Sequence, residues 1–98
     1  MTFTVMSAEN LQTFMRLVGY KPIAKTPEGQ LNCVRPLGAD YPRFHAYVKE
    51  TPDGYIFNLH LDQTRPSYGV GTHAHKGEYD SEIVREERTR IEEVSKNS

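Results

Sequence analysis

A pair of near-identical turn sequences constrains the fold of this chain more than any other feature. Thr26-Pro27-Glu28-Gly29 and Thr51-Pro52-Asp53-Gly54 each hold a proline at the second turn position, where its fixed φ is favourable, and a glycine that is free to take positive φ. Each turn lies between segments rich in strand-forming residues, so each predicts a β-hairpin. Together they predict a four-stranded antiparallel meander with strands at residues 21–25, 30–35, 43–50 and 55–62.

The segments on either side of this meander have the spacing of amphipathic helices. Ser7 is expected to cap a first helix over residues 8–18, and Gly19 is expected to stop it. The buried face of this helix is formed by Leu11, Phe14, Met15 and Val18. A thin apolar stripe predicts a second helix over residues 81–94, and residues 95–98 are expected to fray.

These elements predict a single α+β domain over residues 1–98, with an N-terminal helix, the four-stranded antiparallel meander and a C-terminal helix. Both helices are expected to cover the apolar face of the sheet. Residues 2–5 alternate in polarity and are a candidate for a short strand before the first helix. A chain of 98 residues seldom closes two separate cores, which excludes a multidomain enzyme.

Composition restricts the kinds of binding partner and the cellular compartment that we expect for this protein. The net charge of −1 lacks the positive surplus that binding to nucleic-acid phosphates usually leaves in composition, so composition gives no support to a nucleic-acid partner. No apolar run approaches membrane-spanning length, and the N-terminal residues lack the pattern of an export signal. Cys33 is the only cysteine, so an internal disulfide is excluded and a cytoplasmic location is expected.

The register of the second hairpin decides which side chains share a face. A four-residue loop pairs Glu50 with Tyr55 and makes His45 and His60 direct neighbours. A three-residue loop with a bulge would shift the register by one and bury Arg43 and His45 against apolar side chains. Because that burial is costly, the first register is expected. Its polar face carries Arg43, His45, Tyr47 and Lys49 opposite Asp62, His60, Asn58 and Ile56.

The histidines predict a metal site. In an extended segment residues two apart point to the same side, so His60 with Asp62, and His73 with His75, are each arranged to share one ligand. Glu78 adds a further carboxylate. Imidazole nitrogen and carboxylate oxygen form the mixture that Zn, Mn, Fe or Ni accept. The predicted ligands are His60, Asp62, His73 and His75, and the predicted cofactor is a divalent transition metal, Zn or Mn.

A metal with an open position would make its bound water acidic near neutral pH, which predicts a small metal-dependent hydrolase acting on a phosphoester or another small molecule. Glu78 or Asp62 is the expected general base, Arg43 is expected to hold the phosphate, and His45 completes the catalytic set. Without a metal, His45 and His60 could act as an acid and base pair, with Tyr47 and Arg43 nearby.

The alternative is a non-catalytic binding or adaptor module. Antiparallel sheets commonly present a polar face to water, and a charged helix such as 81–94 is usually a solvated surface. Either surface could meet a protein partner or a second copy of the chain. Small cores often gain stability from association, so a homodimer is part of this alternative.

Overall fold

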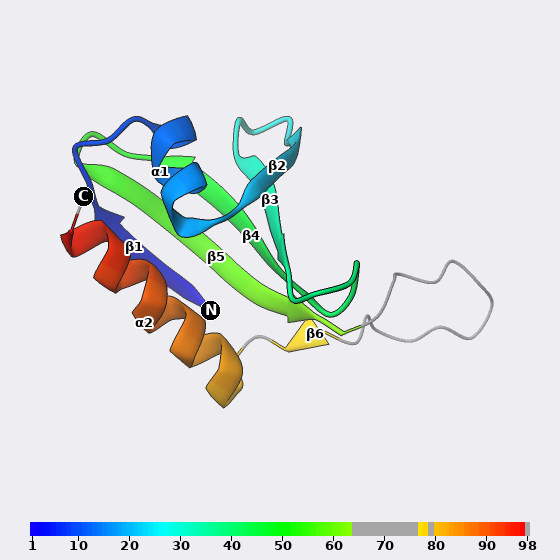
Figure 1. The fold of residues 1–98 in the computed structure, drawn as a ribbon. Coiled ribbons are helices and arrows are strands. Elements are labelled where there is room, and N and C mark those ends of the chain that lie inside the picture. Colours follow the sequence, from blue (N-terminus) through cyan, green and yellow to red (C-terminus); the bar gives the residue numbers. More distant parts are fainter. Residues whose placement is uncertain (64–76, 79, 98) are drawn as a thin grey trace.

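The structure is a computed structural model that describes residues 1–63, 77–78 and 80–97. Within these residues, five strands form one antiparallel sheet in the order β1-β5-β4-β3-β2, and a two-residue strand, β6, also pairs with β5 (Figure 1). The elements are β1 (Thr2–Met6), α1 (Leu11–Val18), β2 (Lys21–Lys25), β3 (Leu31–Pro36), β4 (Arg43–Glu50), β5 (Gly54–Asp62), β6 (Gly77–Glu78) and α2 (Glu82–Lys96).

The predicted meander is present as β2, β3, β4 and β5, but the sheet is larger than four strands. β1 precedes the first helix and pairs antiparallel with β5, with Phe3 opposite Phe57. Phe3 and Val5 are buried while their neighbours in β1 are exposed. Burial of these side chains and pairing of an otherwise open strand edge account for this fifth strand. The candidate strand at residues 2–5 is therefore confirmed, and the expectation of a four-stranded sheet with a helix at the start is wrong.

The first helix begins three residues later than expected. Asn10, not Ser7, caps α1: its Oδ1 accepts a hydrogen bond from the backbone N–H of Thr13 at 2.8 Å. Ser7 instead accepts a hydrogen bond from the N–H of Glu9 at 3.1 Å, within the turn after β1. Gly19 ends the helix as predicted, in the left-handed conformation with φ of 86°.

The core lies between one face of the sheet and the two helices. Phe57, in the interior strand β5, is fully buried, and its ring stacks on Phe3 at 5.3 Å and meets Phe14 of α1 edge-on at 6.2 Å. Val84 and Ile91 of α2 join the same cluster. Both helices therefore cover the apolar sheet face, as predicted, and the other face is left for polar side chains.

Neither helix in the described part of the chain is long and apolar enough to cross a membrane.

The buried carboxylate of Glu87 connects α2 to residues in other parts of the fold. Glu87 accepts hydrogen bonds from the hydroxyl of Tyr20 at 2.7 Å and from Nε of Arg90 at 2.7 Å, and Arg35 lies 3.4 Å away. Helix α2 runs to Lys96, two residues beyond the expected end. Burial, together with the charge of Glu87, raises the pKa of the Tyr20 hydroxyl well above its usual range.

Replacing Tyr20 with Phe should lower the free energy of unfolding at neutral pH by about 1–2 kcal/mol, because Glu87 loses a buried hydrogen-bond donor. The deficit should narrow above about pH 10. There the wild-type protein loses stability, since Tyr20 ionises in the unfolded chain but keeps its proton in the folded one. Chemical denaturation at neutral and alkaline pH measures both effects. Tyr41→Phe is the control, and a Tyr20→Phe deficit independent of pH would contradict the assignment.

Candidate functional site

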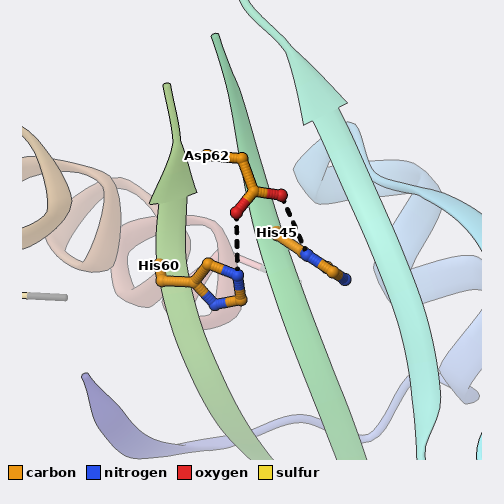
Figure 2. A group of neighbouring side chains, drawn as sticks. All are labelled: His45, His60 and Asp62. Carbon is orange, nitrogen blue, oxygen red and sulfur yellow. Dashed lines mark hydrogen bonds and ion pairs between the residues drawn. The ribbon is translucent and has the colours of Figure 1, made fainter. Parts of the chain in front are cut away.

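The pairing of β4 with β5 creates the site. Arg43 lies opposite Asp62 and His45 lies opposite His60, which confirms the register predicted from a four-residue turn. Phe44, between Arg43 and His45, points into the core, so these polar side chains occupy the opposite face of the sheet. Figure 2 shows His45, His60 and Asp62 on this face, with the helices behind the strands.

Asp62 bridges the two imidazole rings. Its Oδ2 lies 3.1 Å from Nδ1 of His45, and its Oδ1 lies 3.1 Å from Nε2 of His60 (Figure 2). The ring centroids of His45 and His60 are 4.6 Å apart. One ligand atom from each of the three residues lies within 4.8 Å of the others. Two nitrogens and one oxygen therefore converge closely enough to hold a single metal ion.

The three side chains are largely removed from water. Exposed fractions are 12% for the side chain of His45, 11% for His60 and 15% for Asp62. Burial lowers the pKa of His45, while the neighbouring Asp62 carboxylate opposes that shift and Arg43 adds to it. His45 therefore favours the neutral imidazole, which is the form that binds metal ions.

The side chain of Asn32, in β3, contacts the ring nitrogen of His45 that does not face Asp62. Its Oδ1 lies within hydrogen-bond distance of Nε2 of His45, on the side of the ring away from Asp62. When Nε2–H donates to this oxygen, Nδ1 keeps a lone pair that can bind a metal ion; in the other tautomer, Nδ1–H donates to the Asp62 carboxylate. Metal-bound histidines usually make this type of outer hydrogen bond to an oxygen.

Arg43 and two tyrosines line the rest of the site. The guanidinium of Arg43 lies over the ring of Tyr41, 4.6 Å from its centroid, and Nε is 3.6 Å from Oδ2 of Asp62. This Nε is buried and has no hydrogen-bond acceptor in the described part of the chain. The ring of Tyr47 packs against His45, with centroids 4.9 Å apart. The site thus pairs a metal-type donor set with a cationic group held against an aromatic ring.

Not every residue expected at the site can be placed beside this cluster. His45, His60, Asp62 and Arg43 lie together, whereas His73 and His75 lie outside the described residues. The backbone of Glu78 pairs with Leu61, and Gly77 pairs with Asp62. Sequence reasoning missed Asn32 and Tyr41. Asn32 could have been found by extending the register of the meander to β3, where it lies opposite Tyr47.

Comparison with known proteins adds no family to this description. No protein-family profile, no curated protein and no solved structure matches the chain. The function is therefore inferred from the geometry of His45, His60 and Asp62 and of the side chains around them.

Asn32→Ala should change the tautomer of His45. We expect the neutral ring of the metal-free protein to carry its proton on Nε2, and to shift toward the Nδ1–H form once the oxygen of Asn32 is removed, because Nδ1–H can then donate to Asp62. Long-range ¹H–¹⁵N NMR spectra of the imidazole nitrogens distinguish the two forms. Asn58→Ala, an exposed asparagine on the same sheet face, should leave the tautomer unchanged. A wild-type ring already protonated on Nδ1 would contradict this orientation.

Proposed function

We propose that His45, His60 and Asp62 bind one divalent transition-metal ion, and that the protein is a small metal-dependent hydrolase of phosphoesters. The convergence of their three ligand atoms within 4.8 Å, on largely buried side chains, carries this proposal. Two imidazoles with one carboxylate form the donor set of many catalytic zinc sites and also suit Mn²⁺ and Fe²⁺. Zn²⁺ and Mn²⁺ are the proposed ions.

Among the described residues three side chains converge as ligands, and a site of this kind suits catalysis better than a purely structural role. A tetrahedral zinc ion held by three side chains keeps its fourth position for water or substrate, whereas structural zinc sites are closed by four protein ligands. A metal ion in such a site lowers the pKa of bound water to about 7. With a metal ion held by His45, His60 and Asp62, the site would supply a water-derived nucleophile at neutral pH, Arg43 would hold the phosphate, and the alcohol that leaves phosphorus would take its proton from solvent.

The surrounding side chains support this use of the ligands. Asn32 orients His45 so that Nδ1 faces the common centre, and the ring of Tyr47 limits its rotation. Arg43 supplies a positive charge beside Asp62, where a phosphate bound to the metal would lie. In this proposal His45 is a ligand, whereas the sequence placed it among the catalytic side chains. His73, His75 and Glu78 remain candidates from the sequence alone.

Metal binding can be measured directly. Untagged protein freed of metal should bind one equivalent of Zn²⁺ or Mn²⁺ in a calorimetric titration, and Asp62→Asn should weaken this binding by at least about 100-fold, since loss of a ligand costs more than loss of an outer-shell partner. Glu50→Gln removes a carboxylate from the exposed end of β4 and is the matched control. At a metal concentration about 100 times the Kd, the free energy of unfolding should rise by about 2.7 kcal/mol.

Absence of stoichiometric metal, together with melting curves unchanged by a chelator, would refute the metal site. The non-catalytic binding or adaptor module would then be the better description of the polar sheet face. Metal binding that resists Asp62→Asn would place the ion elsewhere and would equally refute the assignment of ligands.

Hydrolysis should depend on the bound ion. With an aryl phosphate ester as substrate, we expect turnover by the metal-loaded protein, loss of turnover after chelation, and recovery when Zn²⁺ or Mn²⁺ is restored. Asp62→Asn should lower kcat/KM on the order of 100-fold, and Glu50→Gln should leave it unchanged. Activity that survives chelation would favour the metal-free acid and base pair of His45 and His60. A metal-loaded protein without turnover would point to a binding role.

A further inference from the structure

Building on the proposed metal site, we propose that the site takes a dianionic phosphate group, as in a phosphomonoester, held jointly by the metal ion and Arg43. This inference specifies the substrate class within the proposed function. It rests on the balance of charge in the site, on the unsatisfied Nε of Arg43, and on the short distance between Arg43 and Asp62.

The charges around the cluster leave a net positive site once a metal is bound. Asp62 contributes one negative charge and Arg43 one positive charge, and the imidazoles are neutral as metal ligands. Among the described residues, the other side chains closest to His45 on this face are uncharged: Asn32, Val34 and Tyr47. The sum is zero without metal and two positive charges with a divalent ion whose bound water still carries both protons. Because the site is largely buried, this excess is costly unless an anion neutralises it.

A phosphomonoester matches that excess better than the alternatives. Its phosphate carries close to two negative charges above its second pKa of about 6. A phosphodiester or a carboxylate carries one charge and would leave the site cationic. The electrostatic balance therefore favours a terminal phosphate.

Arg43 has the geometry to recognise this phosphate. Its guanidinium is held between the ring of Tyr41, at 4.6 Å, and the carboxylate of Asp62, and its Nε is buried without a hydrogen-bond acceptor in the part of the chain described. A buried N–H without an acceptor is unfavourable, and a phosphate oxygen would satisfy it once the side chains that cover Nε move aside. Arginine characteristically binds phosphate through two parallel N–H groups. Tyr41 acts as a positioning residue by stacking on the guanidinium.

The distance between Arg43 and the proposed metal fits a single bridging phosphate. Nε lies 3.6 Å from Oδ2 of Asp62, and carboxylate oxygens bind zinc at about 2.0–2.2 Å. A metal bound through Oδ2 would thus lie no more than about 6 Å from Nε. One phosphate can span this gap by placing one oxygen on the metal and another on the guanidinium.

The experiment compares two probes on the wild-type protein loaded with Mn²⁺, at about pH 8 so that inorganic phosphate is a dianion. Paramagnetic relaxation of the ³¹P signal reports binding near the ion for inorganic phosphate and for dimethyl phosphate, a monoanion. We expect inorganic phosphate to bind at least about tenfold more tightly, and to show no such relaxation with metal-free protein supplemented with Mg²⁺ in place of Mn²⁺. Equal affinities for the two probes would overturn the inference.

Variants of Arg43 test its share of the recognition. Arg43→Met should weaken phosphate binding at least about tenfold while Mn²⁺ still binds, and Arg43→Lys should fall between the two because it keeps the charge but loses the paired N–H groups. Arg16→Met, on the exposed face of α1, is the matched control. Phosphate affinity unchanged in Arg43→Met would overturn the role of Arg43. If Arg43→Met does not fold, Arg43→Lys and the comparison of inorganic phosphate with dimethyl phosphate still test the inference. Failure of the wild-type protein to bind either Mn²⁺ or Zn²⁺ would instead refute the proposed function.

Discussion

The antiparallel pairing of β4 with β5 is the constraint on which the rest of the structure depends. It sets His45 against His60 and Arg43 against Asp62, and the same register turns Phe44, Ala46, Leu59 and Leu61 toward the helices. A shift of one residue would exchange the two faces and place charged groups in the core. The stability of the core and the convergence of the polar cluster are therefore consequences of one hydrogen-bonded ladder, and neither can change without the other.

One face of the sheet forms the hydrophobic core with the helices, and the opposite face carries the candidate functional site. The helical face is closed by apolar contacts and by the Glu87 network, in which a buried carboxylate is surrounded by donors. The opposite face carries a poorly satisfied group, a guanidinium N–H of Arg43 without an acceptor among the described residues, beside two imidazoles that share one carboxylate. Native proteins tolerate such local conflict mainly where a ligand resolves it.

Much of this arrangement follows from local signals in the chain. The Pro-x-Gly turns and alternating polarity were enough to predict four strands, the register of the second hairpin and the neighbouring positions of His45 and His60. The first strand was underestimated because five residues give too short a pattern, and pairing with β5 is a long-range effect. The cap of α1 was misplaced because Ser7 and Asn10 are both good capping residues, and the turn after β1 decides between them. Asn32 and Tyr41 were missed because their roles come from neighbours on other strands and in a loop, which no local spacing reveals.

The pairing of Gly77 with Asp62 has a further consequence for how such a site can diversify. The chain leaves the sheet after Asp62, and Gly77 of β6 pairs with that same residue. Both ends of the intervening stretch are therefore held next to the cluster. Closure entropy grows only slowly with the number of residues enclosed. Evolution or a protein engineer could change the number of residues between these two paired positions at small thermodynamic cost, while the strands that hold the cluster stay in place.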